Sequence, residues 1–141
     1  YMGSTILVRL FAGGLSDKIG RRKSLIIGLV FLVISMFLIA YATGIIQYTI
    51  GAIVYGLATG VNSPTIFAWT ADLSPENRRG VGAGTVFIAL EFAIIVGSLF
   101  TYPLYNNTME SAQILFLLAS GFGLFAIAYL IWHIKRFASA F

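Results

Sequence analysis

The sequence predicts an all-α membrane protein with five transmembrane helices, the first of them truncated. Three observations lead to this fold class. First, 59% of the 141 residues are hydrophobic and only 10% are charged, whereas a soluble domain carries roughly a quarter charged residues. Second, apolar runs recur at about the 20-residue length that crosses a bilayer core. Third, the cations collect in the short turns between these runs. A chain of this size could not bury so much apolar surface in its own interior, so lipid must surround most of it.

The apolar runs divide a single domain, residues 1–141, into five predicted spans. They cover about 1–15, 24–42, 45–71, 80–104 and 112–133. The first is too short to cross a bilayer, so we interpret it as the end of a helix whose start is missing. Pro64 removes a backbone donor inside the third span and predicts a kink. Ser74 followed by Pro75 predicts a helix start, with serine as N-cap and proline at the first helical position.

Charge alternates between the turns. The turns at 17–23 and 72–79, with the C-terminus, hold eight of the nine Lys and Arg residues, and the segments at 43–44 and 105–111 hold none. The positive-inside rule therefore predicts a multi-pass protein of the cell membrane whose basic turns and C-terminus are cytoplasmic. The net charge of +4 therefore reflects membrane topology, and we do not interpret it as a sign of nucleic-acid binding. The chain has no cysteine, a single histidine and no clustered metal ligands or nucleophiles, so we expect no enzyme activity, metal or cofactor.

Polar residues sort the spans into two kinds. Spans 24–42 and 112–133 are almost pure hydrocarbon, which favours contact with lipid. Spans 45–71 and 80–104 carry many polar side chains, which belong against protein or water at membrane depth. We therefore expect these two spans, with the first, to line an interior. The candidate coupling or substrate-cavity residues are Arg9, Gln47, Tyr55, Asn62, Thr65 and Glu91.

Two full charges lie inside apolar runs. Arg9 is eight residues before Asp17, and Glu91 is twelve residues past Arg79, which corresponds to about 12 and 18 Å along a helix. A charge at that depth is costly unless it is paired or used. Glu91 would then be a protonatable coupling group or a cation contact, with Arg9 as its counter-ion or an anion contact. The alternative is a purely structural pair, or an Arg9 side chain that reaches the cytoplasmic surface.

Two glycine pairs have the spacing of close helix packing. Gly56 and Gly60 are four residues apart, as are Gly80 and Gly84. Small residues at this spacing let two helices approach closely in a membrane. Packing is the interpretation that we favour, and a gating hinge is the alternative.

The first basic turn resembles a known signature. Gly13-x-Leu15-Ser16-Asp17-Lys18-x-Gly20-Arg21-Arg22-Lys23 is similar to the loop of the major facilitator superfamily that reads Gly-x-Leu-Ala-Asp-Arg-x-Gly-Arg-Lys. It departs from that pattern at Ser16, Lys18 and Arg22. The stretch from Asp72 to Gly80 resembles the turn between the fourth and fifth helices of a half in the same family. The resemblance covers the whole chain and is strongest at these two turns.

The resemblance implies a fold and a missing partner. Members of this family have twelve helices in two halves, so this chain would be a five-helix portion of one half. Arg9, Glu91 and the basic end of the chain favour helices eight to twelve of the C-terminal half. The other half of the transporter would then be absent, and the chain would be a fragment of a larger protein.

The resemblance also assigns a role to the basic turn. The family's aspartate, here Asp17, would dock on a helix N-terminus in the opposite half, where the helix dipole favours a carboxylate. Arg21 and Arg22 would reinforce this cytoplasmic latch, and its opening would permit the inward-open state. The predicted gating residues are Gly13, Asp17, Lys18, Gly20, Arg21, Arg22 and Arg79.

Three hypotheses about function follow. The first is a secondary transporter that moves small organic solutes by alternating access, by proton-coupled export. The second is an importer or uniporter of sugars or organic acids in the same family. The third is a non-transporting membrane fragment that acts as a partner subunit. The expected partners are the lipid bilayer, a small-molecule substrate, protons and the other half of the transporter, with no nucleic acid.

Overall fold

The structure is a bundle of long helices without strands among the described residues. It is a computed structural model that describes residues 2, 3, 5, 6, 8, 16 and 18–138. Its helices are α2 (Arg21–Ala40), α3 (Ile45–Leu73), the short 3₁₀ helix η1 (Glu76–Arg78), α4 (Arg79–Leu104) and α5 (Met109–Ala138). Four helices in this part of the chain are long and apolar enough to cross a membrane. The predicted all-α class is confirmed.

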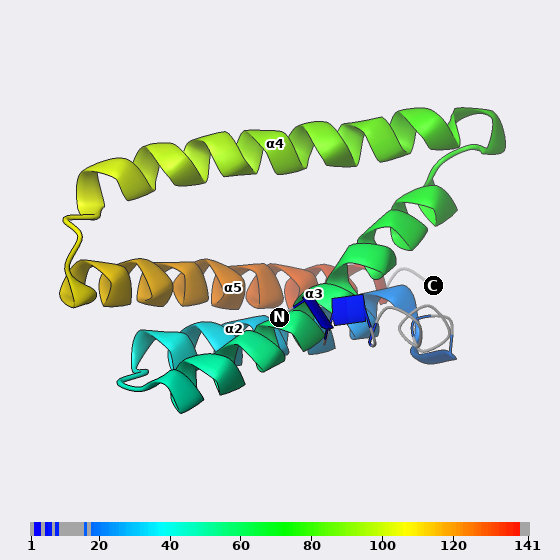
Figure 1. Ribbon diagram of the computed structural model, residues 1–141. Coiled ribbons are helices and arrows are strands. Elements are labelled where there is room, and N and C mark those ends of the chain that lie inside the picture. Colours follow the sequence, from blue (N-terminus) through cyan, green and yellow to red (C-terminus); the bar gives the residue numbers. More distant parts are fainter. Residues whose placement is uncertain (1, 4, 7, 9–15, 17, 139–141) are drawn as a thin grey trace.

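The helices run up and down, so their connections alternate between two ends (Figure 1). The turn after α2 and the loop after α4 lie at one end. The start of α2, the α3–α4 turn and the end of α5 lie at the other. Both charged turns are therefore at the same end of the bundle. At 1.5 Å per residue, the 20 residues of α2 extend about 30 Å, the thickness of a bilayer core.

Helix α2 is the centre of the packing, because it lies along both α3 and α5. Three glycines mark the places where these helices touch. A Cβ added at Gly28 would lie 2.7 Å from Asn62 Cγ, one at Gly51 would lie 2.6 Å from Ile39 Cγ1, and one at Gly123 would lie 2.7 Å from Val33 Cγ2. Contacts this short leave no room for a methyl group. The glycines therefore determine how closely α3 and α5 approach α2.

Helix α4 is packed differently from the others. None of its residues is buried, and it contacts α3 and α5 only sparsely. Figure 1 shows it apart from α5 along most of its length. It is held near its start, where the Phe67 and Phe87 rings are 5.1 Å apart and Gly82 lies against the Ser74 hydroxyl.

The glycine-pair prediction is confirmed for one pair only. Thr5 Oγ1 donates to the Gly56 carbonyl over 3.3 Å, and a Cβ at Gly60 would lie 2.9 Å from Val8 Cβ. The N-terminal segment thus packs on the small-residue stripe of α3. A Cβ added at Gly80 or Gly84 would have no described atom within 4 Å. The prediction that this second pair packs a neighbouring helix is not realised among the described residues.

The α3–α4 turn corrects one prediction. Ser74 does not begin a helix but follows the end of α3, and its hydroxyl donates to the Thr70 carbonyl over 2.7 Å. Pro75 precedes the 3₁₀ turn, so α4 begins only at Arg79. The serine hydroxyl is used by the preceding helix because Thr70 lies one turn behind it. Farther back, α3 bends in its second half (Figure 1), the half that contains Pro64.

We expect Gly28→Ala to destabilise the bundle, because its methyl group would overlap Asn62. Overpacking of this kind costs about 1–3 kcal/mol. Thermal unfolding in detergent, followed by circular dichroism, measures the loss. Gly121→Ala is the matched control, since it adds the same methyl group to α5 where no described atom lies within 4 Å. Equal melting temperatures for the two variants would contradict the packing role of Gly28.

Candidate functional site

The two charged turns are joined by one arginine. Arg21 Nε donates to Asp72 Oδ2 over 2.9 Å, and Arg21 Nη1 donates to Ser16 Oγ over 3.0 Å. Gly20 precedes it with a φ of 94°, a backbone conformation that favours glycine. This turn places Arg21 at the first position of α2, facing the end of α3. Arg21 therefore connects three segments, two of which are 51 residues apart in sequence.

A second cation strengthens the same junction. The Arg22 guanidinium lies 5.8 Å from the centre of the Trp69 ring, within the range of a cation–π contact. Both side chains are partly buried. The start of α2 and the end of α3 are thus held by an ion pair and an aromatic contact side by side.

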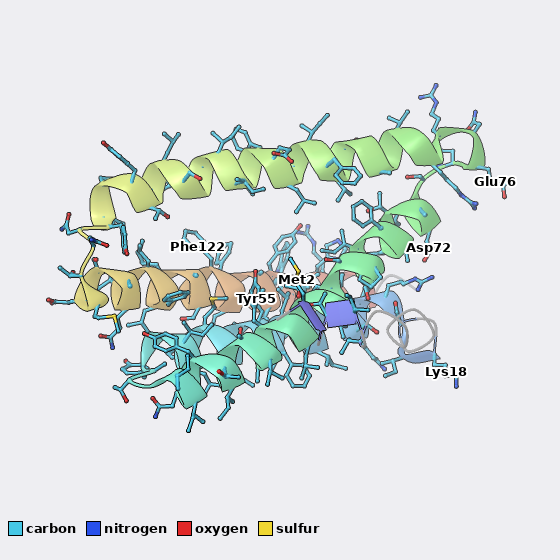
Figure 2. All side chains as sticks on the ribbon, in the orientation of Figure 1. Met2, Lys18, Tyr55, Asp72, Glu76 and Phe122 are labelled. Atoms are coloured by element: carbon cyan, nitrogen blue, oxygen red, sulfur yellow. The ribbon has the colours of Figure 1, made fainter. Side chains whose placement is uncertain are left out.

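The other predicted gating residues lie more loosely. Lys18 is exposed at the same end of the bundle as Asp72 (Figure 2). Among the described residues, Arg79 pairs with Glu76 of its own turn, over 3.8 Å and with both side chains largely exposed, a geometry that contributes little. Gly13 and Asp17 lie outside the described residues, as does Arg9 of the predicted cavity. The docking of Asp17 stays a prediction.

The predicted cavity residues on α3 do not form one cluster. Gln47 Oε1 accepts from the Thr43 backbone nitrogen over 2.6 Å and from its hydroxyl over 3.1 Å, at the start of the helix. Asn62 is buried against Gly28 of α2. Thr65 is fully buried and donates to the Val61 carbonyl over 2.7 Å. Tyr55 is half-buried and lies between Gln47 and Asn62 along the same helix.

Glu91 stands apart from these residues. It lies in α4, where its side chain is exposed. No hydrogen bond or ion pair joins it to another described residue. Asn62 is the other polar group of note, because its Oδ1 is buried without a hydrogen-bond partner in the described part of the chain. Glu91 is thus an exposed polar group without a described partner and Asn62 is a buried one, on two neighbouring helices.

Comparison with known proteins decides the family. The profile of the Major Facilitator Superfamily matches residues 1–140. The chain belongs to the Major Facilitator Superfamily. The resemblance of the two charged turns to this family is thereby confirmed, and so is its membrane-helix architecture. No solved structure matches the chain.

Relatives within the superfamily carry transporter names. An uncharacterized MFS-type transporter of Bacillus subtilis, YwfA, is 32% identical over 69% of this chain and 22% of its own length. The MFS-type transporter criB of Aspergillus cristatus is 38% identical over 60% of this chain and 19% of its own. The quinolone resistance protein NorA of Staphylococcus aureus is 24% identical over 67% of this chain and 24% of its own. The chain thus matches less than a quarter of the length of these relatives.

Sequence reasoning missed Asp72 as a member of the site. It opens the second charged turn, and the alternating charge of the turns already placed it at the same end as Arg21. The alternating charge is enough to suggest an ion pair between the two turns. It does not say which residues pair, because two residues 51 positions apart meet only once the helices have packed.

We expect the effects of Asp72→Asn and Arg21→Gln on stability to be non-additive, because either change breaks the same ion pair. The side chains are 24% and 55% exposed, so loss of the pair should cost only about 0.2–1 kcal/mol, and Arg21→Gln should cost more because it also removes the hydrogen bond to Ser16 Oγ. A double-mutant cycle on detergent unfolding midpoints isolates the coupling. Arg79→Gln serves as control, since its long, exposed pair should contribute nothing measurable. Additive losses in the cycle would show that Arg21 and Asp72 act separately.

Proposed function

We propose that this chain forms helices eight to twelve, within the C-terminal half, of a proton-coupled secondary transporter that exports small organic molecules. The Arg21–Asp72 ion pair is the observation that carries the proposal. It joins the signature turn to the α3–α4 turn, the two stretches in which the resemblance to the superfamily is strongest. The relative named for quinolone resistance supports an organic solute as substrate.

The ion pair gives the basic turns a mechanical role. Alternating access moves one half of a transporter against the other as nearly rigid units. A latch between halves can transmit force only if the turn that carries it is fixed to its own helices. Arg21 fixes the signature turn to α3 through Asp72, and Arg22 adds its contact with Trp69. The turn and the ends of α2 and α3 would then move together.

Glu91 is the group that we assign to coupling. It lies twelve residues beyond Arg79, about 18 Å along α4, and so near the middle of the membrane. A carboxylate at that depth is stable when it is protonated or when it binds a cation, and it is costly otherwise. Taking up a proton on one side and releasing it on the other would couple proton movement to the movement of substrate.

We expect Glu91→Gln in the complete transporter to abolish the part of transport that depends on a proton gradient, because the amide cannot bind and release a proton. Uptake of substrate into inverted vesicles, with and without an imposed pH gradient, measures this part. The rate with the gradient should fall to the rate without it.

Glu110→Gln is the matched control for this experiment. It removes the same charge in the first turn of α5, outside the predicted membrane depth, and should leave the gradient-driven rate unchanged. Gradient-driven transport that persists in the Glu91 variant would exclude Glu91 as the coupling group.

A further inference from the structure

A groove at the basic end of the bundle has the composition of a lipid-binding site. It measures about 460 Å³ and lies between the start of α2, the end of α3 and the last turns of α5. Its cationic wall is formed by Arg21, Arg22 and Lys23, and its apolar wall includes Leu73 and Ile134. This volume lies within the range of small-ligand sites.

The groove has an excess of positive charge. Three cations and one carboxylate, Asp72, line it, and that carboxylate is paired with Arg21. No described carboxylate lies within ion-pair distance of Arg22 or Lys23. Two cationic charges therefore remain available to an anion. The helix dipole adds to their effect, because both residues lie in the first turn of α2, where the backbone favours negative charge.

An apolar stripe leads away from this charge. Lys23 is followed on one face of α2 by exposed apolar residues at helical spacing: Ile27, Val30, Phe31, Ile34, Phe37, Leu38 and Tyr41. Residues three and four apart share a face of a helix, so the stripe is continuous from the lysine to the far end of the span. A face of this kind is solvated by acyl chains, and Lys23 lies at the level of their headgroups.

We propose that this groove binds the headgroup of an anionic phospholipid. The phosphate lies between Arg22 and Lys23, and an acyl chain follows the exposed stripe of α2. The continuity of charge and hydrocarbon favours a lipid over a free anion, because a soluble phosphate would use only the cationic wall. Basic pockets between transmembrane helices bind lipid headgroups in this way. The proposal depends only on membrane insertion and not on the transport that we assign to the protein.

Trp69 provides a direct probe of the groove, which it lines. The chain has two tryptophans, so a Trp132→Phe background leaves the fluorescence of Trp69 alone. The full chain in this background is reconstituted in phosphatidylcholine vesicles with a minor fraction of lipid that carries brominated acyl chains. Brominated phosphatidylglycerol should quench Trp69 more strongly than brominated phosphatidylcholine at the same fraction.

Charge variants then locate the binding. Lys23→Gln should lower the preference for phosphatidylglycerol about fivefold, since a cation near an anionic lipid surface contributes that much, and Arg22→Gln should have a similar effect. Arg78→Gln is the control, because it removes an exposed charge from the other turn and should retain the preference. Circular dichroism confirms that each variant is folded.

Three results would overturn the proposal. The first is equal quenching of Trp69 by the two brominated lipids. The second is an Arg78→Gln variant that loses as much preference as Lys23→Gln, which would indicate a general surface effect. The third is loss of the preference in excess inorganic phosphate at constant ionic strength, which would indicate a site for a soluble anion.

Discussion

The close contact between α2 and α3 is the constraint on which the rest of the structure depends. It runs from Gly51 against Ile39 at one end, through Gly28 against Asn62, to Arg21 against Asp72 at the other. Helix association in a membrane has no hydrophobic driving force, so close van der Waals packing and polar contacts must hold it. The glycines allow α2 and α3 to approach closely, and the Arg21–Asp72 ion pair fixes the two helices to each other at the basic end. Helix α5 also packs along α2. Because α2 and α3 are fixed relative to each other, the basic turns at their ends are held in place as well.

The sequence was sufficient to predict this architecture in outline but not the contacts that hold it. Charge alternation placed the turns before Arg21 and after Asp72 at one end, because that rule depends only on the order of charges along the chain. Which residues meet depends on how each helix is rotated about its axis and how deep it lies in the membrane. A helix that is almost purely apolar, such as α2, has no polar side from which its rotation or depth could be predicted. Gly80 and Gly84 show the same limit. Their spacing would allow another helix to pack closely, but the spacing alone does not show whether a helix lies there.

Threonine hydroxyls show why polarity alone is a weak guide to a transport pathway. Thr59, Thr65, Thr70, Thr85 and Thr101 all lie in the two spans predicted to line an interior, and all donate to carbonyls of their own helices. A hydroxyl satisfied in this way can face lipid or protein at little cost. Such residues therefore raise the polarity of a span without indicating a cavity. Only groups that their own helix cannot satisfy, above all Glu91 and the amide of Asn62, retain that meaning.

The arrangement of α4 extends this argument to a whole helix face. Gly84, Glu91 and Ser98 are seven residues apart and so lie on one side of the helix, whereas the opposite side carries apolar residues, among them Ala93 and Phe100. The described residues cover neither kind of surface, since α4 has no buried residue. Lipid can solvate the apolar side without cost, but it cannot solvate the carboxylate of Glu91. We therefore expect the side that carries Gly84, Glu91 and Ser98 to face protein or water in a membrane. This one charge, rather than the sparse contacts of α4 with α3 and α5, predicts the rotation of α4 about its own axis.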